Sequence, residues 1–334
     1  MFSESQHSRQ ISGSPIFLEK IGIAVGCFLV FSCMAKAQEA KTVDVYLLAG
    51  QSNMQGQGVV DLDHPEYYNG GKGILKNVMK APQSKAIYAH IVGENGQFVI
   101  RDDVFVRFVT KDKIKRGPLT IGFTGYDGKH HIGPEFQFGH VMGKATDHPV
   151  LLIKTAWGGK SLYKDFRPPS SGGQVGDYFR KMISECQAGL ANFSVEIPEL
   201  KGCRPRLKGF VWLQGWNDMF SKESLDEYQS NLVHLINDVR QELEVPTLPV
   251  IIGELGNGGP DASPNMLRLR QAQRDAVQKN HLSNVLFVET SGFARPASAS
   301  PNVGHGHHWF GNAESYFLIG DALARGMLKL NRIK

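Results

Sequence analysis

Residues 43–58 read VDVYLLAGQSNMQGQG, and this stretch decides how the rest of the chain is interpreted. The apolar run at 43–49 has the composition of a strand buried on both faces, which is typical of a parallel sheet. It ends in a polar turn with Ser52 at its tip. In an open α/β sheet, the carboxyl end of a strand faces the edge where ligands bind. Small residues beside the turn let other groups approach closely, and they are Ala49, Gly50, Gly56 and Gly58.

Two interpretations of Ser52 follow from this position. A nucleophilic hydroxyl needs exposure, a fixed position and nearby backbone N–H groups for the anion it creates, and this turn offers all three. An ordinary strand-to-helix turn with Ser52 as the helix N-cap would carry the same residues. The other strand ends of the chain decide between the two.

Four more apolar runs alternate with helical stretches along the chain. This alternation predicts an α/β fold, a three-layer α/β/α sandwich around a mainly parallel five-stranded sheet. Right-handed crossovers then bring the carboxyl ends of the strands to one edge. The expected strands are residues 43–49, 150–155, 207–213, 248–253 and 285–288, and the expected helices are residues 135–145, 177–192, 224–244, 265–280 and 313–330.

Residues 60–132 interrupt the alternation and predict an inserted β-rich segment. Residues 86–92 and 98–109 favour a hairpin across the Gly-Glu-Asn-Gly sequence at 93–96, and loops rich in glycine and lysine follow. Because the insertion comes directly after the serine turn, we expect it to form part of the rim of the site.

The N-terminus has the pattern of a secretory signal peptide. An apolar run of 14 residues at 21–34 is followed by the small-x-small sequence Ala-Lys-Ala at 35–37. Such a run is too short to span a bilayer comfortably, so no stable membrane span is expected. We therefore predict an exported protein, periplasmic or secreted, with residues 1–37 removed and a single domain at 38–334. Lipid attachment at Cys33 is the alternative.

The charge of the remaining chain is mild. It carries 34 Lys and Arg against 30 Asp and Glu, a net charge of +4. Nothing resembles a nucleic-acid-binding motif, so no nucleic-acid partner is expected. The one dense basic cluster is either a solvated loop or a surface that attracts acidic polysaccharide, and it consists of Lys111, Lys113, Lys115 and Arg116.

Two cysteines remain after the signal segment, Cys186 and Cys203. In an exported protein they could form a disulfide. Cys186 lies in a predicted helix and could equally be a buried thiol. The sequence leaves these two alternatives open.

Two further segments come where predicted strands end. Gly158 and Gly159 follow the run at 150–155, and paired glycines offer bare N–H groups to an oxyanion or form a turn that needs positive φ. After the run at 207–213, Gln214 carries an amide donor that could point at the same anion. Asp218 is a carboxylate that could orient an imidazole. The tryptophans of this segment, Trp212 and Trp216, could stack on a sugar ring or belong to the core.

A histidine cluster opens the last predicted helix, in the sequence Gly304-His-Gly-His-His-Trp-Phe-Gly311. A histidine at this place can approach the nucleophile as a general base. Three histidines also raise the possibility of a metal site. However, His305 and His307 would face opposite ways in an extended segment, and no carboxylate cluster completes a ligand set, so no metal is expected.

Together these blocks resemble the SGNH-hydrolase superfamily, which has a flavodoxin-like sheet. Within it the chain resembles the sialate O-acetylesterase-like carbohydrate esterases, the acetylxylan esterase group of family 6. The resemblance spans about residues 43–330. It rests on the Gly-Gln-Ser-Asn-Met sequence at 50–54, the glycine pair at 158–159, the Gln-Gly-x-x-Asp sequence at 214–218 and the histidine before the C-terminal helix.

The resemblance implies a role for each block. Ser52 would be the nucleophile, and its own N–H, an N–H of Gly158 or Gly159 and the side chain of Gln214 would form the oxyanion hole. His308 would be the base, with His307 as the alternative. The residues expected to contact substrate are Gln51, Asn53, Trp216 and His307.

Two departures from the family pattern concern the acid that orients the histidine. The family commonly has a glutamate after Gln-Gly, where this chain has Trp216, and an aspartate two or three residues before the histidine, where it has His305 and Gly306. Asp218 is our first choice for the acid. Glu289, Glu254 or a bare Ser-His dyad assisted by a backbone carbonyl are alternatives. The acid holds the imidazole tautomer, so its loss lowers the rate without abolishing the chemistry.

The resulting hypothesis is a serine esterase that removes O-acetyl groups from carbohydrate, an acetylated polysaccharide or sialic acid, without a cofactor. The alternatives are an esterase of the same fold with another acyl or glycan specificity, and a catalytically impaired carbohydrate-binding protein. The sequence does not give the oligomeric state.

Overall fold

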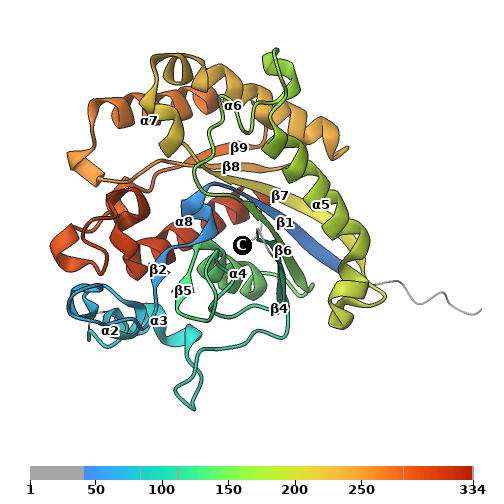
Figure 1. The fold of residues 1–334 in the computed structure, drawn as a ribbon. Coiled ribbons are helices and arrows are strands. Elements are labelled where there is room, and N and C mark those ends of the chain that lie inside the picture. The colour runs from blue at the N-terminus through green and yellow to red at the C-terminus, as the bar shows by residue number, and fades with distance from the viewer. Residues whose placement is uncertain (1–40, 83, 111–112, 281, 333–334) are drawn as a thin grey trace, which may run out of the picture. The chain divides into compact units, whose positions relative to one another are not determined.

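A twisted central sheet organises the fold. The computed structural model describes residues 41–82, 84–110, 113–280 and 282–332, so the predicted signal peptide and Cys33 lie outside the described residues. In this part of the chain seven strands form one sheet in the order β4-β3-β6-β1-β7-β8-β9 (Figure 1). The strands are β1 (Thr42–Gly50), β3 (Val104–Val109), β4 (Ile114–Pro118), β6 (Val150–Ala156), β7 (Arg204–Leu213), β8 (Val250–Gly253) and β9 (Val285–Val288). All neighbours are parallel except β4, which runs antiparallel to β3.

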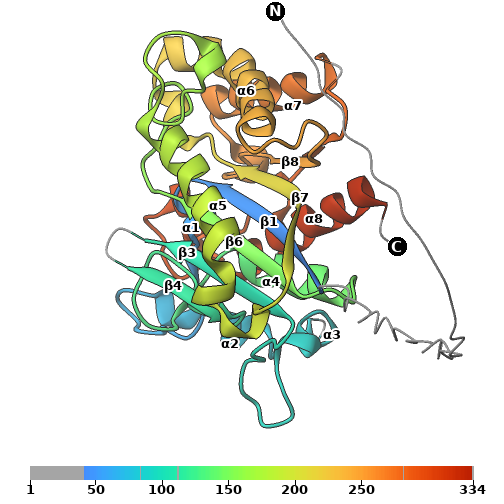
Figure 2. The ribbon, with the colours of Figure 1, turned by 90° about the vertical axis from the view of Figure 1, so that its right-hand side faces the viewer.

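Helices cover both faces of this sheet, which confirms the three-layer prediction. Figure 1 shows α5, α6 and α7 along one face and α4 and α8 along the other, and Figure 2 shows α5 crossing over the strands from the side. The main helices are α4 (Pro134–Lys144), α5 (Asp177–Glu196), α6 (Lys222–Glu242), α7 (Pro264–Gln278) and α8 (Ala313–Asn331). The bounds of each helix agree with those of an expected helix to within a few residues.

The alternation of side chains along β1 explains why the sheet has a core on each face. Val45 and Leu47 belong to the core beneath α5, α6 and α7, whereas Tyr46 and Leu48 belong to the core beneath α4 and α8. Successive side chains of a strand point to opposite faces, so a continuous apolar run fills both cores. The sequence of β1 therefore specifies a central strand.

The insertion extends the sheet, which the prediction of five strands missed. The five expected strands are present, and the insertion adds β3, parallel to β6, and β4 at the edge. The expected hairpin between 86–92 and 98–109 is wrong, because residues 85–88 form the short helix α3 (Lys85–Tyr88) and one isolated bridge joins Val92 to Phe98. Four of the five apolar residues of β3 are buried, and pairing them with β6 covers a strand edge that would otherwise be open.

The two cysteines are not joined to each other or to another described residue. Cys186 is fully buried, and this burial raises the pKa of its thiol to about 12. Of the two alternatives, the buried thiol is therefore the one that the structure supports.

A buried ion pair lies under the serine turn. Lys154 on β6 and Glu135 in the first turn of α4 have side chains that are 0% and 1% exposed, and Lys154 Nζ donates to Glu135 Oε2 over 2.6 Å. The same ammonium donates to the carbonyl oxygens of Gln55 (2.9 Å) and Phe123 (2.8 Å). One charged group therefore connects the sheet, α4, the end of the serine turn and the insertion.

We predict that Lys154→Met lowers the free energy of unfolding by about 3–5 kcal/mol, because it leaves the Glu135 carboxylate buried without its partner. The double variant Lys154→Met/Glu135→Leu removes both charges and is expected to lie within about 2 kcal/mol of wild type. Urea unfolding followed by circular dichroism measures both differences. A double variant less stable than the single one would contradict this account.

Candidate active site

The serine turn is held by the close approach of two strand ends. A side chain at Gly50 would place its Cβ 2.1 Å from the carbonyl oxygen of Leu213 at the end of β7, so only glycine fits. Ser52 is the first residue of the short helix α1 (Ser52–Gln55) and is 8% exposed. The N-cap is Gln51, whose side chain makes no capping bond, so the N-cap interpretation of Ser52 is wrong.

The diglycine lies against this serine. A Cβ at Gly158 would lie 3.6 Å from Ser52 Cβ, and Trp157 N donates to Gly50 O over 3.2 Å. Gly158 and Gly159 are both exposed, and Gly159 has a φ of +71°. The pair therefore forms a turn that needs positive φ and also leaves its backbone accessible beside the hydroxyl.

The histidine loop is tied to the residue after the serine. Asn53 Nδ2 donates to the carbonyl oxygen of His307 over 3.1 Å. Tyr316 OH donates to Asn53 Oδ1 (2.8 Å) and lies 3.2 Å from the carbonyl oxygen of His308. Asn257 Nδ2 donates to the carbonyl oxygens of Gly306 (3.2 Å) and His307 (3.1 Å). Asn53 is 3% exposed, so it positions the histidine loop instead of facing a substrate.

The histidine rings lie close together. The ring centroids of His307 and His308 are 4.0 Å apart, and those of His305 and His307 are 5.4 Å apart. Burial, followed by the positive charges of His307 and His305, lowers the pKa of His308 to about 4. His308 is therefore neutral near pH 7 and has a lone pair available for a proton. Within the described part of the chain, no hydrogen bond joins Ser52 Oγ to these rings.

The carboxylates expected to orient the base have other partners. Asp218 is fully buried, its Oδ1 accepts from Tyr163 N (2.8 Å), and its Oδ2 accepts from Leu162 N (2.8 Å) and Gln214 Nε2 (2.6 Å). Burial raises the pKa of Asp218 to about 6. No described contact joins Asp218 to a histidine ring, because backbone N–H groups of the loop after β6 occupy its oxygens.

The two alternative acids are also engaged elsewhere. Glu254 Oε2 accepts from the backbone N of Thr290 and of Ser291, both over 2.8 Å. Glu289 is 65% exposed and pairs with Arg274 over 2.6 Å. Among the described contacts, neither carboxylate reaches His308.

Gln214 has no amide hydrogen left for an oxyanion. Its Nε2 donates to Lys160 O (3.0 Å) and to Asp218, and its Oε1 accepts from Tyr228 OH over 3.1 Å. The expected oxyanion donor instead fastens the loop that follows β6. The sequence shows that an amide side chain stands at this strand end. It does not show that Lys160 O and Asp218 accept both of its hydrogens.

The neighbouring Asn217 has the free amide that was expected of Gln214. Gln51 is 2% exposed, its Nε2 donates to Asn217 Oδ1 over 2.9 Å, and its Oε1 accepts from Gly215 N over 3.2 Å. Gln51 is thus a positioning residue. Asn217 is half-buried with its carbonyl oxygen engaged, and its amide nitrogen donates to no described residue. The signal in the sequence that could have identified Asn217 is its place one residue before Asp218, in the same segment after β7.

Of the two tryptophans, one is in the core and one borders the histidines. Trp212 is fully buried against Phe166, with ring centroids 5.0 Å apart. Trp216 is half-buried and lies 5.8 Å from the ring of His307 and 6.1 Å from Phe220, which is 68% exposed. Trp216 therefore borders the histidine loop, and its contact with substrate stays a prediction.

The insertion borders the serine turn, as expected of a rim. A Cβ at Gly125 would lie 3.3 Å from Gln55 Nε2, and one at Gly158 would lie 3.0 Å from Gln55 Oε1. Lys115 Nζ holds this part of the insertion by donating to the carbonyl oxygens of Gly122 (3.0 Å) and Thr124 (2.8 Å).

The basic cluster is largely engaged in such internal contacts. Lys113 pairs with Asp127, and Lys115 is surrounded by carbonyl oxygens, while Lys111 lies outside the described residues. The described residues contain no group of three or more His, Cys, Asp or Glu side chains that could hold a metal ion. They also contain no helix long and apolar enough to cross a membrane.

The fold and the comparisons with known proteins define an α/β enzyme that hydrolyses esters. Residues 42–329 match the family model described as "Carbohydrate esterase, sialic acid-specific acetylesterase", and the chain belongs to this family of carbohydrate acetylesterases.

Two known proteins are similar to this chain. A probable carbohydrate esterase of Arabidopsis thaliana is 24% identical over 255 residues, which cover 74% of this chain and 79% of the relative. The solved structure of that Arabidopsis protein superposes with a TM-score of 0.53 at 17% identity, covering 86% of this chain and 98% of its own. A carbohydrate acetylesterase of Xanthomonas citri gives a TM-score of 0.51 at 17% identity, covering 85% of this chain and 57% of its own. These two similarities support the fold.

We predict that Asp218→Asn lowers the free energy of unfolding by about 2–4 kcal/mol, because an amide group would face backbone N–H donors in a fully buried place. The matched control Asp177→Asn changes a carboxylate that is 85% exposed and is expected to stay within about 0.5 kcal/mol of wild type. Urea unfolding gives both values. If Asp218→Asn kept full stability but altered the pH profile of catalysis, Asp218 would be the acid that orients the base.

Proposed function

We propose that this protein removes O-acetyl groups from carbohydrate by nucleophilic attack of Ser52. The observation that carries the proposal is the approach of Gly158 to Ser52, with 3.6 Å between Ser52 Cβ and a Cβ built on the glycine. This puts exposed backbone beside a hydroxyl at the carboxyl edge of a parallel sheet. An acyl group bound there would have its carbonyl carbon next to the hydroxyl and its oxygen next to N–H donors.

In the first step, Ser52 Oγ attacks the acetyl carbonyl carbon while His308 accepts the hydroxyl proton. The oxygen of the tetrahedral intermediate becomes an anion and accepts hydrogen bonds from Ser52 N–H and from an N–H of Gly158 or Gly159. We assign the third donor to Asn217 Nδ2 in place of Gln214, since both amide hydrogens of Gln214 have internal acceptors. Each such donor contributes about 3–4 kcal/mol to the lowering of the barrier.

His308 then returns the proton to the sugar oxygen as the C–O bond breaks, which leaves an acetyl group on Ser52. A water molecule repeats the cycle and releases acetate. His307 remains the alternative base. Because Asp218, Glu254 and Glu289 have other partners, we propose a Ser-His dyad without an orienting acid, which lowers the rate but keeps the chemistry.

Substrate and location complete the proposal. The substrate class is an acetylated carbohydrate, with Trp216 beside the histidines as an aromatic surface for a sugar ring. We also propose export, which rests on the apolar run at 21–34 and the Ala-Lys-Ala sequence that follows it.

The test of the nucleophile is Ser52→Ala. Hydrolysis of p-nitrophenyl acetate and release of acetate from acetylated xylan are expected to fall about 10⁴-fold or more in kcat/KM, because no other described group takes the place of the hydroxyl. The control Ser298→Ala changes an exposed serine and should retain wild-type rates. Equal rates for Ser52→Ala and wild type would refute the assignment. Glycan binding by a wild-type protein that turns over neither ester would identify it as a binding protein.

The low pKa of His308 predicts an unusual pH profile. A base must be neutral, and a pKa of about 4 keeps His308 neutral across the range in which an unperturbed imidazole would become protonated. The value of kcat/KM for p-nitrophenyl acetate should therefore stay level from about pH 8 down to pH 5 and fall near pH 4. An inflection near pH 6.5 would mean that the base is a solvated histidine.

A further inference from the structure

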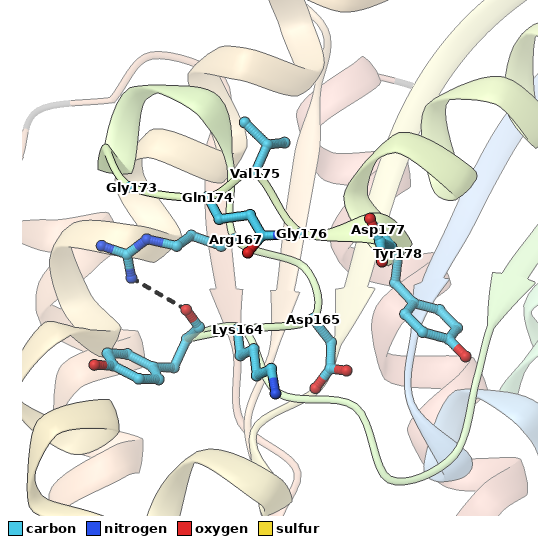
Figure 3. A pocket seen from close by; sticks show the side chains of 10 residues that line it. Lys164, Asp165, Arg167, Gly173, Gln174, Val175, Gly176, Asp177 and Tyr178 are labelled. Carbon is cyan, nitrogen blue, oxygen red and sulfur yellow. Dashed lines mark hydrogen bonds between the residues drawn. The ribbon is translucent and has the colours of Figure 1, made fainter.

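A cavity lies in the loop that leads from the diglycine to α5 (Figure 3). Its volume is about 310 Å³, which is in the range of pockets that hold small organic ligands. Figure 3 shows Gln174 on one side and Lys164 and Asp165 on the other. Its lining includes Tyr163, Lys164, Asp165, Gln174, Asp177 and Tyr178.

This cavity lies in the loop that follows the diglycine of the proposed active site. A Cβ built on Gly158 would lie 3.6 Å from Ser52 Cβ, and Tyr163 of the cavity follows Gly158 by five residues. Five residues span at most about 18 Å, so this is the upper limit on the distance between Gly158 and Tyr163. Gln214 and Asp218 hold the intervening backbone at Lys160 O and Tyr163 N. The loop that carries the cavity is therefore fixed relative to Ser52, at a distance that an oligosaccharide longer than one sugar can span.

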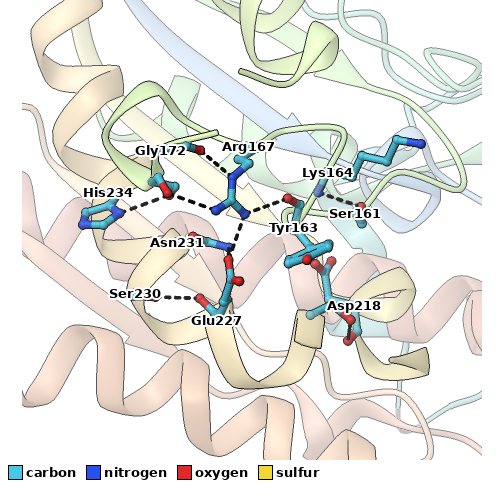
Figure 4. A network of polar contacts seen from close by, with 12 residues as sticks. Ser161, Tyr163, Lys164, Arg167, Gly172, Asp218, Glu227, Ser230, Asn231 and His234 are labelled. Atoms are coloured by element: carbon cyan, nitrogen blue, oxygen red, sulfur yellow. Dashed lines mark hydrogen bonds and ion pairs between the residues drawn. The ribbon is translucent and has the colours of Figure 1, made fainter. Parts of the chain in front are cut away.

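The loop around the cavity is held rigidly although it has little regular structure. The guanidinium of Arg167 donates to the carbonyl oxygens of Tyr163 (3.1 Å), Ser171 (3.0 Å) and Gly172 (2.8 Å) and to Glu227 of α6 (2.9 Å), as Figure 4 shows.

A second side chain of α6 fastens the same loop. Asp238, 4% exposed, accepts from Ser170 N (2.8 Å) and Ser170 Oγ (2.6 Å). These bonds fix the loop before any ligand arrives, which lowers the entropy that binding would otherwise cost.

The lining has the chemistry of a site for a neutral sugar. The amide of Gln174, which has no described hydrogen bond, suits the hydroxyl groups of a sugar. The rings of Tyr163 and Tyr178 contribute to the wall and are held by cations, Arg167 over Tyr163 (5.4 Å) and Lys160 over Tyr178 (4.3 Å). The charged lining residues balance, with Lys164 and Arg167 against Asp165 and Asp177.

Most of these charges are already paired. Asp165 lies 3.4 Å from Lys160 Nζ, Asp177 lies 3.3 Å from Arg180, and Arg167 pairs with Glu227. Among the charged lining residues only Lys164 has no described ion pair, and one ammonium is not the cluster of positive charge that an acidic sugar would need.

We propose that this cavity is a subsite for a neutral sugar residue of the oligosaccharide whose acetyl ester lies at Ser52. The inference rests on the proposed function and narrows it, since it favours acetylated neutral oligosaccharides over O-acetylated sialic acid. The subsite binds a part of the substrate that does not react, so it acts on the affinity for long substrates and leaves small esters unaffected.

The test fills the cavity by Gln174→Trp, a change at an exposed side chain without a described hydrogen bond. For acetylated xylo-oligosaccharides, KM is expected to rise about five- to tenfold, while kcat/KM for p-nitrophenyl acetate stays at the wild-type value. The control Gln241→Trp adds the same ring at an exposed position of α6 outside the lining and should change neither. An equal loss on both substrates, or no change on either, would overturn the proposal.

A binding measurement separates this inference from the proposed function. Calorimetry with unacetylated xylo-oligosaccharides and the Ser52→Ala protein should show binding that the added Gln174→Trp change weakens about five- to tenfold, even if wild type hydrolysed no ester. A Gln174→Trp effect seen only with O-acetylated sialic acid would refute a neutral subsite. Hydrolysis of p-nitrophenyl acetate by wild type together with absent oligosaccharide binding would refute the subsite and leave the esterase proposal intact.

Discussion

The arrangement of the site depends on the Lys154 ammonium buried beneath it. Burial of an ammonium and a carboxylate costs several kcal/mol per ion unless both are fully satisfied, and here the ammonium has a carboxylate and two backbone carbonyls as partners. One of those carbonyls belongs to Gln55, the last residue of α1. Because Gly158 follows the strand that carries Lys154, the same bond that fixes α1 to β6 also fixes Ser52 relative to Gly158. The main effect of the ion pair is thus to fix the position of Ser52 relative to Gly158, and its contribution to the free energy of unfolding is secondary.

Gln51 and Asn53, the residues on either side of Ser52, also make hydrogen bonds that connect the turn to other segments. Gln51 reaches the end of β7 through Asn217 and Gly215, and Asn53 reaches the histidine loop through its backbone. Each polar side chain beside Ser52 is buried and contacts a different strand end or loop. This explains why a polar turn is almost entirely enclosed, and why residues expected to bind substrate instead hold the partners of the serine in place.

The sequence was a good guide wherever a local pattern determines the structure. Apolar runs without alternation identify strands buried on both faces, and right-handed crossovers place their ends at one edge, so the meeting of Gly158 with Ser52 was predictable. The neighbours of each strand and the hydrogen-bond partners of the polar side chains were not predictable in this way. The run 104–109 is a strand by composition, but its pairing with β6 depends on an open edge elsewhere. Likewise, Gln214 and Asp218 have the right chemistry for catalysis, and only the surrounding N–H and carbonyl groups decide that they fasten a loop.

In the proposed mechanism, the low pKa of His308 and the lack of a carboxylate partner among the described residues have a common consequence. A buried imidazole without an acid is neutral over a wide pH range but holds a proton weakly, which disfavours the transfer from Ser52. The anion that forms on the substrate beside it offsets this cost, since its negative charge stabilises the new imidazolium. In the proposed mechanism, N–H donors would hold that anion in a partly enclosed place, where their interaction is stronger than in water. In a Ser-His dyad of this kind, the backbone of the diglycine and the amide of Asn217 must therefore supply stabilisation that an orienting acid would otherwise share.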